Sequence, residues 1–269
     1  MPKVSVIMGI YNCAPYLQEA LDSLYAQTFQ DFEIVLCEDG SSDNTYEIAQ
    51  ENQKNHSNIV LLKNPHNLGL NQTLNNCLDV AKGEYIARMD GDDISIPTRF
   101  EKEVAFLDAH PEFAIVSCPM IYFDENGEFG HGRGGYAPTK HAFITGTPHC
   151  HAPCMVRREA YEAVGGYTVD KRLLRVEDYH LWMKMYALGY RGYNLDECLY
   201  AMRDDRAATN RRRKQSKSDT IFHNNEVYAH LLACKTLHLP IKGYIYSFIP
   251  IIKRLMPIKM YEYYHRKRK

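Results

Sequence analysis

The N-terminal third of the chain alternates between short apolar runs and longer amphipathic stretches. Apolar runs rich in β-branched residues, such as VSVIMGI at 4–10 and FEIVLCE at 32–38, have the length of strands. In the stretch between them, apolar residues recur at helical spacing, as for Leu17, Leu21 and Leu24. This alternation predicts parallel strands joined by right-handed crossover helices, and therefore an α/β fold. The predicted strands are 4–10, 32–38, 58–64 and 84–90, and the predicted helices are 15–27, 43 to about 54, and 69–83.

Beyond residue 96 the pattern is less regular. Residues 124–147 are rich in glycine and show little periodicity, which predicts loops or a mobile flap. We expect a main domain at 1–205 and a helical, basic C-terminal extension at 206–269. Further helices are predicted at 98–110, 155–167, 177–190 and 213–236, and a further strand at 113–123.

The composition narrows the classes of protein to which the chain can belong. Apolar residues make up 45% of the 269 positions, enough to bury a large core. The formal net charge of −1 provides no overall field for nucleic acid, so no nucleic-acid partner is expected. The eight cysteines lack the spacing of a disulfide framework, which indicates a reducing cytoplasm. The N-terminus shows no signal-peptide pattern, and no run approaches the ~20 apolar residues of a membrane span.

Polar turns follow three of the predicted strands: YNCA at 11–14, EDGSSD at 38–43 and DGDD at 90–93. The carboxyl ends of parallel strands meet at one edge of a sheet, and ligands bind in the crevice beyond that edge. We therefore expect these three turns to share one rim and to form the binding site.

The stretch RMDGDD, which begins at Arg88, places the carboxylates of Asp90, Asp92 and Asp93 within four positions. Like charges a few ångströms apart repel by roughly 1 kcal/mol per pair even in water, so a cation should lie nearby. Arg88 and Arg99 flank the cluster, but oxygen ligands also suit Mg²⁺ or Mn²⁺. Because Mg²⁺ held by few carboxylates usually recruits substrate phosphates, the cluster predicts a metal-bound nucleotide diphosphate. The alternative is a solvated turn in which Asp93 caps the next helix.

Five blocks along the chain resemble the family 2 glycosyltransferases, in the order and spacing of that family. The third block looks especially like bacterial exopolysaccharide and capsule transferases. The resemblance implies a GT-A fold, which is a Rossmann-like, mostly parallel sheet flanked by helices, here with a helical C-terminal extension. The blocks are VSVIMGIYN, EDGSSDNT, NLGLNQTLNNCLDVAKGEYIARMDGDDIS, CMVRREAYEAVGGY and VEDYHLWMKMYALGY, and they span residues 4–190.

The same resemblance implies an inverting glycosyltransferase that depends on Mn²⁺ or Mg²⁺. It would move one sugar from a nucleotide-sugar, with UDP favoured, to a glycan or lipid-linked acceptor in the synthesis of surface polysaccharide or lipopolysaccharide. The QxxRW signature of processive members is absent, and the single tryptophan is Trp182, which favours one addition per acceptor. Two alternatives are a sugar-nucleotide pyrophosphorylase, whose glycine-rich loop is missing after the first strand, and a sugar-nucleotide-binding protein without transferase activity.

The resemblance assigns donor-binding roles to individual residues. The carboxylate of Asp39 would accept the imide N–H of uracil, with Glu38 beside it. Asp92 would bind the metal, and Asp90 would face the ribose or share the metal. The residues implied to contact the nucleotide are Ile10, Tyr11, Asn12, Glu38, Asp39, Asn75, Asp90 and Gly91.

Asp178 matches the catalytic base of the family, and Glu177 precedes it. The alternative is that both carboxylates only cap the predicted helix, where negative charge suits the helix dipole. His151 is a candidate for the acceptor or metal site, with loop packing as the alternative. Arg203 and Arg206 are candidates for contacts to the phosphates, although the basic stretch that follows them also reads as a solvated helix start.

Two positions depart from the family pattern. His180 stands where the family often has Asp, which affects the acceptor contacts. Leu74 stands where many relatives carry an Arg before the Asn that matches Asn75, which affects one contact to the base.

The C-terminal segment at 241–269 mixes aromatic and aliphatic residues with prolines and cations. A basic amphipathic segment of this kind lies in the plane of a membrane interface. We expect a cytoplasmic protein that this tail can hold peripherally at the inner face of the cytoplasmic membrane, where lipid-linked acceptors would be met. The alternative is a terminal helix packed on the body of the protein.

Overall fold

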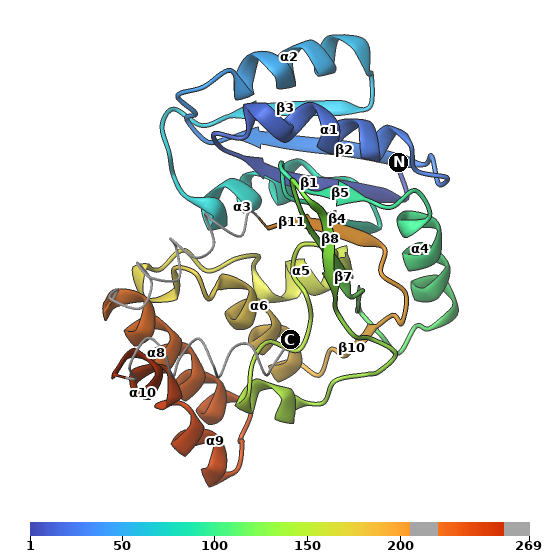
Figure 1. Ribbon diagram of the computed structural model, residues 1–269. Coiled ribbons are helices and arrows are strands. Elements are labelled where there is room, and N and C mark those ends of the chain that lie inside the picture. Colours follow the sequence, from blue (N-terminus) through green and yellow to red (C-terminus); the bar gives the residue numbers. More distant parts are fainter. Residues whose placement is uncertain (205–219, 256–269) are drawn as a thin grey trace.

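The structure, a computed structural model, describes residues 1–204 and 220–255 (Figure 1). Its largest sheet has seven strands in the order β10-β6-β9-β4-β1-β2-β3. β1 pairs in parallel with β2 on one side and with β4 on the other, and β2 pairs in parallel with β3. The strands of this sheet are β1 (Val4–Ile10), β2 (Phe32–Glu38), β3 (Ile59–Lys63), β4 (Tyr85–Arg88), β6 (Ile115–Ser117), β9 (Met155–Arg157) and β10 (Gly192–Asn194).

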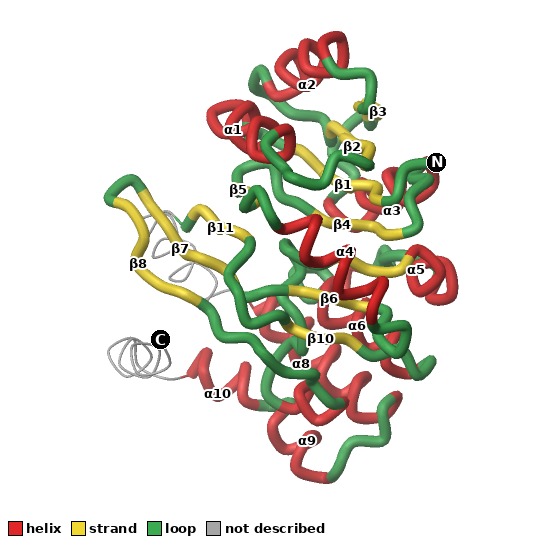
Figure 2. Tube along the Cα trace, turned by 90° about the vertical axis from the view of Figure 1, so that its right-hand side faces the viewer, coloured by secondary structure: helices red, strands yellow, loops and turns green. Residues whose placement is uncertain are grey.

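The predicted strand–helix alternation is confirmed in the N-terminal part, where β1 and β2 have the predicted bounds. Helices cover both faces of the large sheet, as the views in Figures 1 and 2 show. The helices of these layers are α1 (Ala14–Tyr25), α2 (Thr45–Asn55), α3 (Leu70–Val80), α4 (Arg99–Ala109), α5 (Arg158–Val164), α6 (Glu177–Ala187) and α8 (Thr220–Thr236).

Two apolar cores form because successive residues of a strand point to opposite faces of the sheet. From β1, the buried side chains of Val6 and Met8 lie in one core with residues of α1 and α4. Ile7, between them, lies in the other core with residues of α3, α5, α6 and α8. The sheet is therefore buried on both faces, and only its edges at the strand ends remain for binding.

A second sheet has four strands in the order β5-β11-β7-β8. The predicted strand at 113–123 is in fact two strands in different sheets, β6 and β7, separated by Cys118 and Pro119. Proline has no N–H to give to a ladder, which explains the break. The prediction of loops at 124–147 is also wrong in part, because β8 pairs with β7 and a 3₁₀ helix, η1, follows at Lys140–Ile144. The strands of this sheet are β5 (Ile94–Ser95), β11 (Tyr200–Arg203), β7 (Met120–Asp124) and β8 (Gly127–His131).

The predicted helix at 155–167 begins three residues later, at Arg158. The preceding residues form β9, which pairs antiparallel with both β4 and β6. Met155 and Val156 are fully buried there, so long-range pairing overrides the local helical pattern. The end of α5 agrees with the prediction, since Gly165 closes it in the left-handed conformation with φ of 65°.

The C-terminal helices pack against the helix layer that contains α6. α8 packs against α6, η1 and η2 (Lys171–Leu173), and its buried Cys234 lies in the same apolar core as Trp182 of α6. α9 (Ile241–Tyr246) and α10 (Ile249–Leu255) follow. The predicted boundary between 1–205 and 206–269 falls outside the described residues, so the division remains a prediction. Within the two described ranges, no helix is long and apolar enough to cross a membrane.

Candidate active site

The loops after β1, β2 and β4 meet at one edge of the large sheet, as the sequence predicts. Asn12 joins the first two loops: its Oδ1 accepts the Ser42 N–H at 2.9 Å, and its own N–H donates to Ser41 Oγ at 3.1 Å. Gly91 packs the third loop against the first, because a Cβ at this position would lie 2.8 Å from Cys13 Sγ. The three turns therefore form one rim.

Asp39 is buried at the end of β2 and holds the connection between β3 and α3. Its Oδ1 accepts hydrogen bonds from Asn64 Nδ2 at 2.8 Å and from the Leu68 N–H at 2.7 Å. Its Oδ2 accepts a third from the Gly69 N–H at 3.0 Å, and Gly69 has a positive φ of 85°. Asp39 therefore shapes this loop, whereas its contact with uracil stays a prediction.

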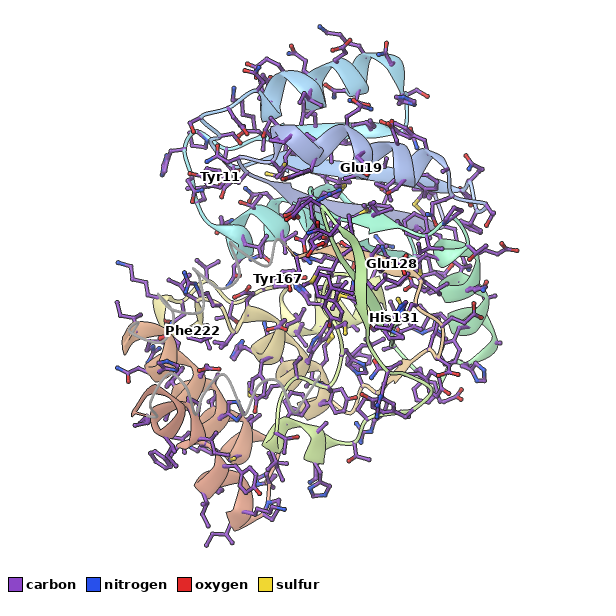
Figure 3. All side chains as sticks on the ribbon, viewed as in Figure 1. Tyr11, Glu19, Glu128, His131, Tyr167 and Phe222 are labelled. Atoms are coloured by element: carbon purple, nitrogen blue, oxygen red, sulfur yellow. The ribbon has the colours of Figure 1, made fainter. Side chains whose placement is uncertain are left out.

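The other residues predicted to bind the base differ in their exposure. Ile10 is buried below the loops, and Glu38 is buried with its Oε1 accepting the Ser41 N–H. Tyr11 is half exposed, at 49%, and is labelled in Figure 3. A nucleotide base can stack on an exposed aromatic ring. Of these three residues, Tyr11 is thus the one whose side chain is open to such a contact.

The acidic loop begins where β4 ends, at Arg88. Arg88 is buried, and its guanidinium binds the carboxylate of Asp90 with both terminal nitrogens, Nη1 at 2.5 Å from Oδ2 and Nη2 beside Oδ1. The chain turns after Asp90, and Asp92 is exposed. Arg99, the other flanking cation, is turned away and pairs with Glu103 at 3.2 Å. Arg88 thus provides the cation that the cluster was expected to need at Asp90.

Asp93 anchors the acidic loop to β11. Its Oδ2 accepts a hydrogen bond from the Tyr200 hydroxyl at 2.9 Å, and its Oδ1 accepts one from the Arg203 N–H at 2.8 Å. Burial, and then the charges of Asp90 and Asp92, raise the pKa of Asp93 to about 8. The Tyr200 oxygen also accepts the Asp90 N–H at 3.1 Å. The sequence contains no signal for this role of Tyr200, which lies in a distant strand.

Arg203 lies next to the acidic loop, but its guanidinium already has partners. Nε donates to the backbone oxygen of Asp92 at 3.1 Å, and Nη2 forms an ion pair with Glu19. A phosphate would have to share Arg203 with Glu19, so the predicted phosphate contact remains untested. Arg206 lies outside the described residues.

Glu177 and Asp178 are the first two residues of α6. Burial raises the pKa of both carboxyl groups, and the positive charge of Arg88 opposes that rise in both. Asp178 Oδ1 also accepts the Tyr179 N–H at 2.7 Å. The buried guanidinium of Arg88 therefore acts on both carboxylates: it binds Asp90 directly, and its charge influences the predicted base, Asp178. The start of a helix favours negative charge, so a capping role and a catalytic role are compatible here.

Tyr167 connects α3, α5 and the loop before β9, and its role was not predicted from the sequence (Figure 3). Its hydroxyl oxygen lies 2.7 Å from His151 Nε2 and 3.2 Å from the hydroxyl of Tyr161. Its backbone N–H and C=O each form a 2.8 Å hydrogen bond with the side-chain amide of Asn75. Burial, and then Arg88, hold the pKa of His151 well below its usual range. The side chain of Asn75 therefore links α3 to the segment that carries Tyr167, and its nucleotide contact stays a prediction.

The donor chemistry of the acidic loop fits a divalent cation. Mg²⁺ and Mn²⁺ prefer oxygen ligands and usually combine one or two carboxylates with substrate phosphates. Asp92 is the exposed carboxylate that would hold such an ion, with Asp90 as a second ligand that Arg88 already neutralises in part. In the described part of the chain, no three His, Cys, Asp or Glu side chains are grouped as a complete metal site. Any cation here would therefore depend on the diphosphate for its remaining ligands.

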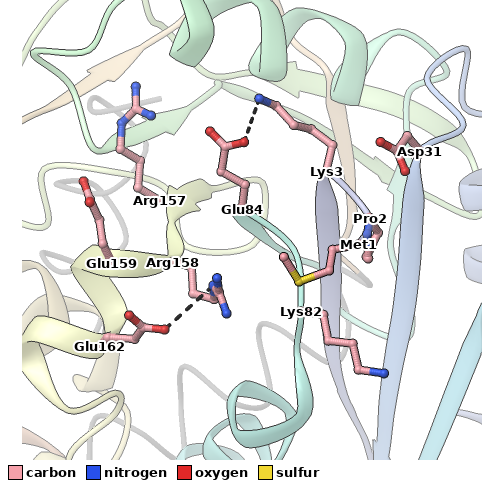
Figure 4. A pocket seen from close by; sticks show the side chains of 10 residues that line it. All are labelled: Met1, Pro2, Lys3, Asp31, Lys82, Glu84, Arg157, Arg158, Glu159 and Glu162. Atoms are coloured by element: carbon pink, nitrogen blue, oxygen red, sulfur yellow. Dashed lines mark hydrogen bonds and ion pairs between the residues drawn. The ribbon is translucent and has the colours of Figure 1, made fainter.

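A cavity of about 460 Å³ lies away from this rim (Figure 4). Its lining comes from the residues before β1, β2 and β4, from the last residue of the antiparallel β9 and from α5, which is the opposite edge of the sheet. Charges in it pair with one another, as Lys3 does with Glu84 at 2.8 Å and Arg158 with Glu162 at 3.7 Å. The rim of loops, not this cavity, therefore remains the candidate active site. The lining residues are Met1, Pro2, Lys3, Asp31, Lys82, Glu84, Arg157, Arg158, Glu159 and Glu162.

Comparison with known proteins decides the family. The model of the family described as "Glycosyl transferase family 2" matches residues 5–165. The chain belongs to glycosyltransferase family 2. The matched region of this family 2 glycosyltransferase contains all three loops of the rim, of which the acidic loop is the third, and it ends before α6.

Two relatives of this family 2 glycosyltransferase match it over almost its whole length. EpsE of Bacillus subtilis (strain 168), which is assigned as a glycosyltransferase, is 42% identical over 268 residues, covering 99% of the chain and 94% of EpsE. The UDP-Glc:alpha-D-GlcNAc-diphosphoundecaprenol beta-1,3-glucosyltransferase WfaP of Escherichia coli is 26% identical over 252 residues, covering 91% of the chain and 95% of WfaP. The chain is therefore an enzyme, a glycosyltransferase.

Solved structures confirm the predicted GT-A fold of this family 2 glycosyltransferase. S. aureus TarS 1–349 in complex with UDP-GlcNAc superposes with a TM-score of 0.71 at 18% identity, covering 96% of the chain and 77% of TarS 1–349. A mannosyltransferase from Pyrobaculum calidifontis in complex with GDP-Man and Mn²⁺ superposes with a TM-score of 0.65 at 21% identity, covering 93% of the chain and 74% of that protein.

Proposed function

We propose that the protein transfers a single sugar from a UDP-sugar to a lipid-linked acceptor in the synthesis of a surface polysaccharide, with inversion at the anomeric carbon. The name of the E. coli relative, which specifies UDP-glucose and an undecaprenol diphosphate acceptor, supports the donor and the acceptor class. The UDP-GlcNAc bound to TarS supports the same donor nucleotide. The Mn²⁺ bound to the mannosyltransferase supports a requirement for Mn²⁺ or Mg²⁺. The absent QxxRW signature supports one addition per acceptor.

The observation that carries the proposal is the buried guanidinium of Arg88. It forms a two-pronged ion pair with Asp90 of the acidic loop, and its charge opposes the rise that burial causes in the pKa of Asp178 at the start of α6. One cation therefore links the carboxylates that face the donor diphosphate with the carboxylate that faces the acceptor. A binding protein without transferase activity would have no need of this second carboxylate.

The side chains of the site suggest how the reaction proceeds. Tyr11 stacks on the base, and Asp39 accepts the imide N–H. Asp178 takes the proton from an acceptor hydroxyl while the hydroxyl oxygen forms a bond to the anomeric carbon. The bond from that carbon to the diphosphate breaks on the opposite face, and UDP leaves with the bonding electrons. General base catalysis of this kind typically contributes about 10²–10⁴-fold to the rate.

A divalent cation at Asp92, when bound, supplies positive charge for the departing diphosphate. The ion pair of Arg88 with Asp90 fixes the shape of the loop that would hold such an ion. Tyr200 and Asp93 fix the far end of the loop to β11.

The proposal extends to the organisation of the chain. Residues 1–205 form the nucleotide-sugar-binding and catalytic domain, and residues 206–269 form a basic extension. That extension holds the protein at the cytoplasmic face of the membrane, where a lipid-linked acceptor is presented. The sequence supports this, since residues 241–269 carry eight Lys and Arg against one Glu.

The decisive experiment replaces Asp178 by Asn and measures transfer from a panel of UDP-sugars to polyprenyl diphosphate-linked acceptors with Mn²⁺. The variant should transfer at least about 100-fold more slowly, because the base is lost, and should bind UDP as tightly as the parent. Asp79→Asn is the matched control, since Asp79 is exposed on α3, and it should leave both quantities unchanged. Unchanged turnover in Asp178→Asn would remove the base assignment. UDP binding without transfer by the parent on the whole panel would favour a binding protein.

A further inference from the structure

α9 and α10 form the last described helical segment, joined by a short turn at Ser247 and Phe248. Helical hydrogen bonds flank this turn: the Ser247 N–H donates to Gly243 O at 2.9 Å, and the Ile252 N–H donates to Phe248 O at 3.3 Å. Within each helix, residues three and four apart lie on the same side.

Five large apolar side chains of this segment are exposed to solvent, by between 39% and 80%. Three of them share one side of α9, at spacings of three and four residues, and the other two lie in the turn and in α10; we call the five side chains the apolar stripe. The stripe consists of Ile241, Tyr244, Ile245, Phe248 and Ile252.

The side of the segment that faces the protein carries small residues instead. Gly243 packs on α8, where a Cβ would lie 2.9 Å from Cys234 Sγ. Ser247 is fully buried, with its hydroxyl 3.0 Å from Gly243 O, and Pro250 is buried as well. A helix that packs on a core normally buries its apolar side. This segment packs Tyr246 against the core but leaves five large apolar side chains exposed, and an exposed apolar surface of this kind marks a site of interaction.

Basic residues surround the stripe in the sequence. Lys242 follows Ile241, the first residue of the stripe, and is exposed. Residues 241–269 carry eight Lys and Arg against one Glu, a net charge of +7, whereas the whole chain has −1, which leaves −8 for residues 1–240. The positive charge of the chain is therefore concentrated in the part that carries the stripe.

We infer that the apolar stripe docks the enzyme onto an anionic lipid bilayer. A helix with an apolar side and neighbouring Lys and Arg residues lies in the interface, with its apolar side chains buried about 5–10 Å into the lipid. Anionic lipids complement the charge of +7. A second copy of the chain does not, because a two-fold contact through the stripe would bring two segments of the same positive charge together. Among the described residues no helix is long enough to span, which agrees with a segment that lies on the surface.

This docking rests on the proposed function for its purpose, because it brings the enzyme to the bilayer that holds a lipid-linked acceptor. α10 and α9 pack on α8, and α8 packs on α6, which begins with Glu177 and Asp178. A bilayer at the stripe thus meets the helix layer that carries the predicted base (Figure 1). The docking itself rests on the exposed residues and their charge, and it does not require that the protein be active.

The test is flotation of the full-length protein with vesicles, followed by measurement of the membrane-bound fraction. Vesicles of phosphatidylcholine with about a third of phosphatidylglycerol should bind at least tenfold more protein than vesicles of phosphatidylcholine alone, and high salt should weaken binding. The double variant Ile245→Ser, Phe248→Ser should lose at least tenfold of the binding. Both residues are exposed, so the fold should survive. Leu188→Ser is the control, since Leu188 is 60% exposed at the end of α6, outside the stripe.

Unchanged vesicle binding by the double variant would overturn the inference. If light scattering of that variant then showed a change from dimer to monomer, the stripe would be a contact between copies. Sugar transfer by the same proteins, measured without vesicles, separates this inference from the proposed function. Bound vesicles with no transferase activity would refute the proposed function alone, and activity with no stripe-dependent binding would refute the docking alone.

Discussion

Replacement of Asp39 by Asn tests whether this residue is part of the framework as well as a contact for the nucleotide. The substitution keeps the shape of the side chain but turns one of its two oxygens into an NH₂ donor. Asp39 is buried and accepts three hydrogen bonds, two at Oδ1 and one at Oδ2. The amide cannot satisfy all three donors in either of its two orientations.

The structure sets the size of the expected loss. The better orientation keeps the oxygen at the Oδ1 position, so Asn64 and Leu68 retain their acceptor while the Gly69 N–H faces an NH₂ group. One hydrogen bond to a charged acceptor is lost, at about 1.5–3 kcal/mol, and the other two become weaker neutral bonds. We expect the free energy of unfolding to fall by about 2–5 kcal/mol in the absence of any nucleotide.

Urea denaturation at pH 7 measures this loss directly. The chain has a single tryptophan, Trp182, which is fully buried in α6, so its fluorescence reports the loss of the core. Asp79→Asn removes the same charge from an exposed position of α3 and should change the free energy of unfolding by less than about 0.5 kcal/mol.

The reasoning would be refuted if Asp39→Asn lost UDP binding while its stability stayed within about 1 kcal/mol of the parent. In that case the three hydrogen bonds would contribute nothing to the loop before α3, and the carboxylate would serve the ligand alone. A loss of stability that saturating UDP does not reverse, together with weaker UDP binding, would support both roles.

Three further predictions concern the rim and the core. Gly91→Ala should lower the free energy of unfolding by about 1–3 kcal/mol, because the new methyl group would meet Cys13 Sγ at 2.8 Å. In urea denaturation, the double variant that combines Cys13→Ala with Gly91→Ala should recover the lost stability. Gly146→Ala, where no atom lies within 4 Å, should have almost no effect. A double variant no more stable than Gly91→Ala would exclude this contact as the cause. Burial lowers the pKa of His149 to about 4, below the ~6.5 of an unfolded chain, so the unfolded state takes up the proton first as the pH falls. The contribution of His149 to the free energy of unfolding is present above pH ~6.5 and falls by about 2 kcal/mol between pH 7 and pH 5. His149→Gln should therefore lose about 2 kcal/mol less stability than the parent over this pH range. Equal losses in the two proteins would contradict the prediction. EDTA should abolish sugar transfer and Mn²⁺ should restore it, with Asp92→Asn needing at least tenfold more Mn²⁺, whereas transfer that is insensitive to EDTA would refute the metal assignment.

The periodicity of the sequence was sufficient for the N-terminal half of the fold. β1 and β2 have the predicted bounds because alternation of apolar residues is a property of each segment by itself. The rim followed from the same information, since parallel strands always bring their carboxyl ends to one edge of a sheet. The prediction failed where distant partners decide the local state, as in β9, whose residues lie between β4 and β6.

The sequence by itself therefore determined the class of fold, the rim and the residue types that line it. Only the tertiary structure decided which partner each of these residues has: Arg88 for Asp90, three donors for Asp39, and Tyr200, 107 residues away, for Asp93. The same holds for α9 and α10, where the sequence indicated an amphipathic segment but not which of its apolar side chains are exposed to solvent. The physical reason is that spacing is fixed between neighbours in the chain, whereas hydrogen bonds, ion pairs and the choice of the buried side depend on segments that only folding brings together.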